Sequence, residues 1–351
     1  MRRLSASLVR WSLGGLVLFA VASAASTALA APAAPPIPET VVQVQPKLVK
    51  VYGAGGLRGL EAYQSGFLIS ADGLVLTAWS YVLDSDSVTV TLNDGRKFEA
   101  RLLGADPRLE VAVLKIEAAG LPYFDLRQAV DAEAGTRVLA LSNLFGVAMG
   151  NEPASVQRGT ISVKTRLEAR RGVYEIPYDG PVYVLDAVTN NPGAAGGALV
   201  TRRGELVAML GKELRNALNS TWLNYAVPID QLRGTVEQIR AGKFVVRKSE
   251  EGAKKPARPL TLGMLGIVLV PDVVERTPPY VDAVAPNSPA AKAGVQPDDL
   301  VVLVGDRFIA SCKALAGELQ YVDFEDQLRL TVLCGQQMKE FVLQVSPKDG
   351  K

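Results

Sequence analysis

Histidine is absent from this chain of 351 residues, and the absence removes the commonest general base and the commonest metal ligand from any mechanism. An excess of charge of one sign is also missing. The 38 basic and 36 acidic residues leave a formal net charge of +2, which does not indicate nucleic acid as a partner. We therefore expect no metal, no cofactor and no nucleic-acid partner.

Cysteine is nearly absent as well, with Cys312 and Cys334 as the only two residues of this type. In an oxidising compartment they are able to form one disulfide, but two buried thiols fit equally well, because a sequence does not give the distance between them. What the chain does have is apolar residues. Hydrophobic side chains make up 48% of the residues, and the length suits about two domains with real cores.

The first thirty residues have the pattern of an export signal. Arg2, Arg3 and Arg10 precede an apolar run over 11–21, and small residues then lead to the segment 28–30, which is Ala-Leu-Ala. This order predicts a cleaved signal peptide and a periplasmic or extracytoplasmic protein; an uncleaved membrane anchor is the alternative. Residues 31–40 are rich in proline, and we expect an extended tether there.

Short strands dominate residues 41–243. Segments such as "SVTVTL" and "KFEARLLG" are of strand length and rich in Val, Leu and Thr, and the turn Asn93-Asp94-Gly95 joins these two as a hairpin. Ten or more such segments favour an antiparallel barrel or a pair of barrels. One helix is predicted over 228–242, with Leu232, Val236 and Ile239 on its apolar face. Charged residues 244–259 form a linker, and residues 260–347 a second compact unit with strands and two short helices.

Several motifs carry a resemblance to a known family. In the first unit these are "SGFLIS-ADGLVLTAW", "DPRLEVAVLKI", "VLALSNLFG", "NNPGAAGGALV" and "NYAVPI"; in the second they are "GMLGI" and "VAPNSPAAKAGVQPDDLVVLVGDRFI". Together they resemble the HtrA (Deg) family. The resemblance implies a mainly β protein, with a trypsin-like double β-barrel domain at 41–243 followed by a PDZ domain at 260–347.

The resemblance also locates the three positions of a serine-protease triad. A serine attacks the carbonyl, a histidine accepts its proton and an aspartate orients the imidazole. In this chain the histidine position falls on Ser80, the aspartate position on Glu110 and the serine position on Ala195. From these replacements we predict an inactive homologue. The alternative is a serine-type endopeptidase with a non-standard catalytic arrangement.

The loop around Ala195 keeps its glycines. In an HtrA-like domain the amides of Gly193 and Ala195 would form an oxyanion hole, so that a vestigial loop still accepts a carbonyl or carboxylate oxygen. The alternative is that the barrel needs this turn whether or not anything binds.

The PDZ-like unit is where the sequence predicts binding. In such domains a loop of backbone amides receives the terminal carboxylate of a peptide that adds as a strand to the sheet edge. By resemblance the loop is Gly263, Met264, Leu265, Gly266 and Ile267, and Leu315 and Leu319 face the groove from a helix. The alternative for the two leucines is a position in the core.

We therefore expect an exported pseudoprotease that binds peptides, protein C-termini or unfolded envelope proteins, as a chaperone, an adaptor or a regulatory subunit. By resemblance its partners include further copies in a trimer or an active HtrA relative. Besides the non-standard endopeptidase, an envelope structural protein that binds no peptide remains open.

Overall fold

A computed structural model describes residues 34–53, 62–85, 87–167, 178–215, 221–245, 255–273, 276–335 and 337–345. The expected signal peptide lies outside these residues, as do 246–254 of the expected linker. Within the described residues, no helix combines the length and the apolar character needed to cross a membrane.

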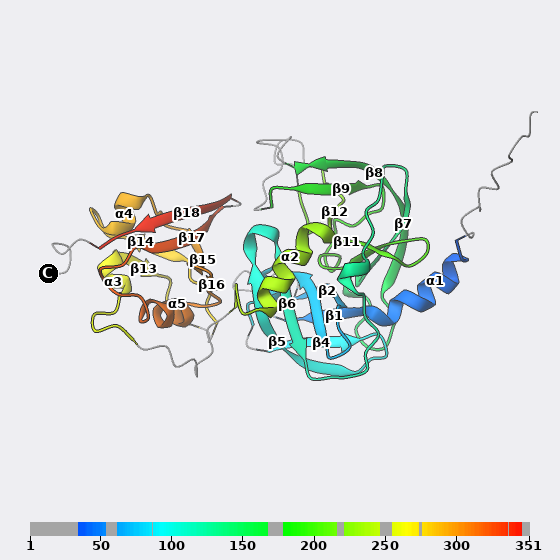
Figure 1. The fold of residues 1–351 in the computed structure, drawn as a ribbon, viewed down its shortest axis with the longest axis horizontal. Coiled ribbons are helices and arrows are strands. Elements are labelled where there is room, and N and C mark those ends of the chain that lie inside the picture. Colours follow the sequence, from blue (N-terminus) through cyan, green and yellow to red (C-terminus); the bar gives the residue numbers. More distant parts are fainter. Residues whose placement is uncertain are drawn as a thin grey trace, which may run out of the picture. The chain divides into compact units, whose positions relative to one another are not determined.

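The first half of the N-terminal domain is a closed antiparallel barrel (Figure 1). Its strands follow the order β1-β2-β3-β6-β5-β4. They run over β1 Leu48–Tyr52, β2 Tyr63–Leu68, β3 Leu74–Ala78, β4 Val88–Leu92, β5 Lys97–Asp106 and β6 Val111–Ile116. β3 is buried along its whole length, as its unbroken run of Leu, Val, Thr and Ala predicts for a strand packed on both faces. Asn93-Asp94-Gly95 forms the predicted turn between β4 and β5, where Gly95 takes a φ of +86°.

The second half is another closed barrel, in the order β10-β11-β12-β9-β8-β7. Its strands are β7 Arg137–Ser142, β8 Ser155–Arg166, β9 Pro181–Leu185, β10 Ala198–Thr201, β11 Leu206–Leu210 and β12 Tyr225–Pro228. The pair of barrels confirms the predicted mainly β, trypsin-like architecture. Short 3-10 turns connect several strands: η1 Gln45–Lys47, η2 Tyr81–Leu83, η3 Pro107–Leu109, η4 Leu126–Gln128 and η5 Leu144–Gly146.

Helix α2, Ile229–Arg240, follows the last strand and confirms the predicted helix. Leu232, Val236 and Ile239 are buried at 0 to 2% exposure, so the apolar stripe at helical spacing faces the barrel as expected. Arg240 in the last turn carries the charge that the negative end of a helix dipole favours.

The expected tether is partly a helix, α1 Ile37–Val44, so the prediction of an extended chain to residue 40 is wrong. Pro38 lies in the first turn, where its missing amide costs no hydrogen bond, and Glu39 is an acidic residue near the positive end of the dipole. The Thr40 hydroxyl donates to the carbonyl of Arg202 at 2.8 Å, and Thr40 and Val44 are fully buried. Contact with the barrel thus outweighs the preference of a proline-rich segment for an extended conformation.

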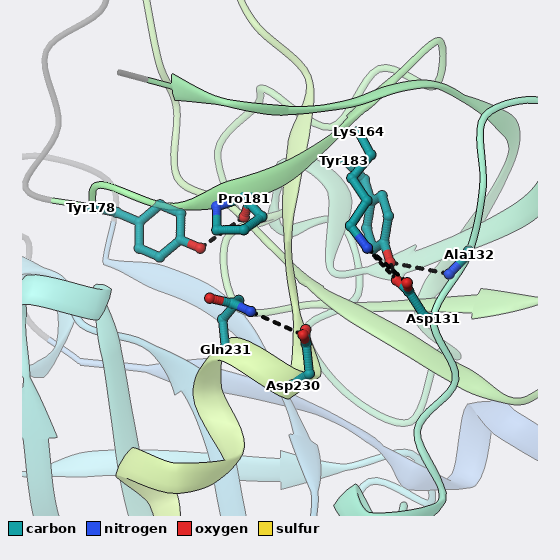
Figure 2. A network of polar contacts seen from close by, with 8 residues as sticks. All are labelled: Asp131, Ala132, Lys164, Tyr178, Pro181, Tyr183, Asp230 and Gln231. Carbon is teal, nitrogen blue, oxygen red and sulfur yellow. Dashed lines mark hydrogen bonds and ion pairs between the residues drawn. The ribbon is translucent and has the colours of Figure 1, made fainter. Parts of the chain in front are cut away.

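A polar network ties the entry of β7 to strands β8 and β9 (Figure 2). Both carboxylate oxygens of Asp131 accept from Nζ of Lys164 at 2.7 Å, and Asp131 also accepts from the hydroxyl of Tyr183. The amide of Ala132 donates to that same hydroxyl at 3.1 Å. Lys164 and Tyr183 hold the pKa of Asp131 below its usual value, while burial and Asp131 raise the pKa of Tyr183. Because these polar atoms bond to one another, we interpret the network as structural.

The C-terminal unit contains two small sheets. β13 Ile267–Leu269 pairs with β14 Val281–Val284, and β15 Leu300–Val304, β16 Arg307–Phe308, β17 Leu328–Cys334 and β18 Gln337–Leu343 form a sheet in the order β16-β15-β17-β18. The two predicted helices are α4 Pro289–Ala293 and α5 Cys312–Leu319, capped by Ser288 and Ser311. A further short helix, α3 Leu262–Leu265, begins at the Thr261 cap. Cys312 and Cys334 are free thiols, so the structure supports separate thiols and not the alternative of a disulfide.

Candidate functional site

The hydroxyl of Ser80 is fixed at the end of β3. It accepts from the amide of Val82 at 3.1 Å as the cap of η2, and donates to Oε1 of Gln64 at 2.5 Å. Nε2 of Gln64 in turn donates to Oγ1 of Thr77 and to the carbonyl of Ala78, at 2.7 and 2.8 Å. The acceptor of the Ser80 proton is therefore a neutral amide, which orients the hydroxyl but does not take up a proton near neutral pH.

Glu110 forms a buried ion pair that connects the two barrels. It is 3% exposed and takes a left-handed φ of 54° after η3. From the second barrel, Nζ of Lys212 lies 2.6 Å from its Oε1, and the hydroxyl of Tyr225 donates to its Oε2 at 3.3 Å. Burial and the neighbouring Glu110 raise the pKa of Tyr225 well above its ordinary value, so this phenol stays neutral.

Lys212, Tyr225 and Gln64 are partners that the sequence analysis missed. Only a chemical argument was able to point to a partner for Glu110. A buried glutamate with no histidine to hold needs another cation, and Lys212 is the nearest positive charge once the barrels have folded. Nζ of Lys212 also lies 5.5 Å from the ring centroid of Trp79, the residue before Ser80.

The loop that ends in Ala195 is held open by Ser65 on β2. The Ser65 amide donates to the carbonyl of Ala195 at 3.0 Å, and its hydroxyl donates to the carbonyl of Gly193 at 2.6 Å. The amide of Asn143 donates to the same hydroxyl at 2.7 Å. With both carbonyls turned to Ser65, the amides of Gly193 and Ala195 have no acceptor among the described residues. An oxyanion hole needs free backbone donors of this kind.

Titratable groups elsewhere in the domain do not gather into a metal site. Within the part of the chain that the structure describes, no three His, Cys, Asp or Glu side chains lie where they would hold an ion together. The chemistry available at the three triad positions is therefore that of Ser80, the Glu110–Lys212 pair and the amides of the Ala195 loop.

In the C-terminal unit, the segment predicted as a carboxylate loop is the helical turn α3 and its exit. The amide of Met264 donates to Oγ1 of Thr261 at 3.3 Å, that of Leu265 to the Thr261 carbonyl at 3.3 Å, and that of Gly266 to the Gly263 carbonyl at 3.1 Å. The two bonds to Thr261 are slightly longer than is usual for an amide donor, whereas the bond of Gly266 has an ordinary length. The expected row of free amides is thus engaged within the turn, and the role of these residues stays a prediction.

Strand β13 leaves the turn with one edge unpaired. The carbonyl of Gly266 and the amide of Val270 bond to Ala285 and Tyr280 on the β14 side, at 2.8 and 3.0 Å. Because hydrogen-bonding groups alternate along a strand, the backbone groups of Ile267 and Leu269 face away from β14. Among the described strands β13 has no second neighbour. Figure 1 shows α3 leading directly into this strand.

Leu315 and Leu319 on α5 lie in the core, at 1% and 0% exposure, in one cluster with Leu265 and Ile267. Their burial fits the alternative stated above, a position in the core. Their direct contact with a peptide stays a prediction.

Comparison with known proteins assigns both units. The trypsin-like peptidase domain family matches residues 64–209, and the PDZ domain family matches residues 280–333. A probable periplasmic serine endoprotease of the DegP-like kind from Ectopseudomonas mendocina is 33% identical over 254 residues, covering 71% of this chain and 48% of the relative. A protein of the same description from Halomonas elongata is 31% identical over 278 residues, covering 77% and 53%. The chain thus spans about half the length of the curated relatives it matches.

Solved structures agree on the fold. An HtrA-type protease with a decapeptide is 22% identical and covers 89% of this chain and 97% of that one, with a TM-score of 0.50.

These comparisons contradict the prediction that the chain is not an enzyme, because the relatives are named serine endoproteases. That prediction assumed that hydrolysis must use the three side chains at the triad positions. Serine hydrolases with other partners, such as a Ser-Lys pair, show that the assumption does not hold in general.

Proposed function

We propose that this chain, whose two units match the trypsin-like peptidase and PDZ domain families and which is similar to DegP-like endoproteases, captures peptide segments at β13 in the periplasm. The ligands are protein C-termini and exposed segments of unfolded envelope proteins. Captured segments are held, as by a chaperone, or passed to a partner, as by an adaptor or regulatory subunit. A trimer or a complex with a second HtrA protein fits this role.

The free edge of β13 carries this proposal. A peptide that adds antiparallel to β13 receives main-chain hydrogen bonds from Ile267 and Leu269 without disturbing the pairing with β14. Its terminal carboxylate then lies at the α3 turn, where a charged acceptor competes with the long bond of the Leu265 amide to the Thr261 carbonyl. Val268, 51% exposed on the strand, offers apolar contact.

Titration of the full chain with one decapeptide in three forms tests this mode. The peptide ends in an apolar residue and carries a free carboxylate, an amidated C-terminus, or N-methyl groups on alternate backbone amides. We expect amidation to weaken binding about tenfold or more, since a charged acceptor is lost, and N-methylation to abolish it, since strand pairing is blocked. Equal affinities for all three forms would show that capture does not occur by strand addition.

A second candidate function is peptide-bond cleavage with a non-standard arrangement, which the names of the relatives and the two free amides favour. Here the amides of Gly193 and Ala195 bind the carbonyl oxygen, and Ser80 supplies the hydroxyl. Without an imidazole, the Ser80 proton has to leave through water, so turnover is slow.

Incubation with unfolded casein measures this activity, and Ser80→Ala is the test variant. We expect slow cleavage that falls to the uncatalysed level in Ser80→Ala, because the candidate reaction uses this hydroxyl, and that survives in the exposed control Ser87→Ala. Cleavage of equal rate in all three proteins would assign the activity to another group. No cleavage by the wild type would eliminate this candidate and leave peptide capture untouched.

A further inference from the structure

A cavity of about 340 Å³ lies in the peptidase domain, and its lining includes none of the residues at the triad positions. It opens between the turn joining β2 to β3, the segment around η4 and one face of α2. Its floor is apolar, with Ile69, Leu126 and Val236 at 8, 8 and 2% exposure. This volume is at the lower end of the range for small-ligand sites.

Helix α2 contributes a ridge of charged side chains to the rim. Arg233, Glu237 and Arg240 lie at helical spacings of four and three residues, on the same face as Val236. The Cα atoms of two residues seven apart are separated by about 10 Å along the helix axis. Long arginine side chains from both ends are therefore able to converge on one ligand over the apolar floor.

A third arginine, Arg127, lies on the opposite rim and is already paired with a carboxylate. Nε and an Nη of Arg127 donate to the two carboxylate oxygens of Asp125, both at 3.0 Å. This pairing holds the pKa of Asp125 below its ordinary value and neutralises both groups. Within the described residues, Arg233 and Arg240 have no such carboxylate within 4.0 Å. Arg233 and Arg240 thus carry the unpaired positive charge of the cavity. Glu237 lies between them on the helix, and Asp72 of the β2–β3 turn interacts electrostatically with Arg240 at longer range.

We propose that this cavity is a binding site for a phosphate-bearing ligand. Guanidinium groups recognise phosphate through paired, charge-assisted hydrogen bonds, and Arg233 and Arg240 hold the anion in this way. The apolar floor and the ring of Tyr123, 42% exposed at the rim, accommodate the organic part. A soluble phosphate ester and the headgroup of an anionic phospholipid share this chemistry.

Binding to the full chain is measured at low ionic strength with two probes, because salt screens exposed charges. Pyrophosphate represents the soluble source and is followed by calorimetry. Vesicles of phosphatidylglycerol, compared with phosphatidylcholine, represent the lipid source and are followed by sedimentation. We expect binding to at least one probe, weakened about tenfold or more by each of Arg233→Gln and Arg240→Gln.

Two further variants make the test specific. Arg158→Gln removes an exposed arginine from β8, outside the cavity, and is expected to leave binding unchanged. Glu237→Gln removes the opposing charge and is expected to tighten binding. Intrinsic tryptophan fluorescence shows that each variant is folded. Failure of the wild type to bind either probe would overturn the proposal, as would an equal loss in Arg158→Gln. Decapeptide titrations separate this result from the proposed capture at β13, which shares none of these residues.

Discussion

Replacing Lys212 with methionine is expected to destabilise the peptidase domain by about 3 kcal/mol or more, because it leaves the charge of Glu110 buried without a cation. The glutamate side chain is only 4% exposed, whereas that of Lys212 is 27% exposed. The pair is therefore asymmetric. Glu110→Gln leaves the lysine partly solvated and is expected to cost about 1 kcal/mol, chiefly through the lost charged hydrogen bond.

The double variant distinguishes a buried charge from lost packing. When Glu110→Gln is added to Lys212→Met, the uncompensated charge disappears, and the double variant is expected to be more stable than Lys212→Met alone. If Lys212→Met and the double variant unfold at the same denaturant concentration, the pair is not what stabilises this region.

Urea unfolding followed by tryptophan fluorescence suits this measurement. The chain has three tryptophans, at positions 11, 79 and 222, and none in the PDZ unit, so the signal reports the peptidase domain. Lys164→Met is the matched control. Its partner Asp131 has a side chain that is 59% exposed, and such surface pairs contribute about 1 kcal/mol or less.

Gly193→Ala is expected to destabilise the domain by about 3 kcal/mol or more and to disturb the loop that carries the free amides. Gly193 has a φ of +89°, and a Cβ there would lie 2.0 Å from the carbonyl oxygen of Asn143 and 2.9 Å from the ring of Tyr63. Asn143 cannot move away easily, because its amide is bonded to Ser65 and its Oδ1 accepts from Ala148.

Gly135→Ala is the control for backbone strain alone. Gly135 has nearly the same φ, +87°, but nothing lies within 4 Å of the added methyl group. It should cost only about 1 to 2 kcal/mol, the strain of a left-handed residue with a side chain. The difference between the two variants isolates the crowding in the site loop. Equal losses in the fluorescence-monitored unfolding would mean that the loop relaxes around the methyl group.

Local patterns predicted many elements correctly. Helix α2 and the β4–β5 hairpin needed only a regular apolar stripe and an Asn-Asp-Gly turn, which act through neighbours in the chain. Helix α1 was missed, because a proline-rich segment favours an extended chain. The helix is stabilised by the burial of Thr40 and Val44 against the second barrel. α3 was missed for a similar reason. Its four residues are too few for a periodic signal, and the Thr261 cap decides their conformation.

The sequence by itself determined the two-domain β architecture, the absence of an imidazole and the identity of the groups at Ser80, Glu110 and Ala195, since composition and short-range pattern suffice for these. Only the tertiary structure decided what those groups touch. It brought Lys212 and Tyr225 to Glu110, turned the Gly193 and Ala195 carbonyls to Ser65, and gathered Arg233 and Arg240 over an apolar floor. These contacts join residues far apart in the chain, and their energies depend on burial and distance, which exist only once the barrels have closed.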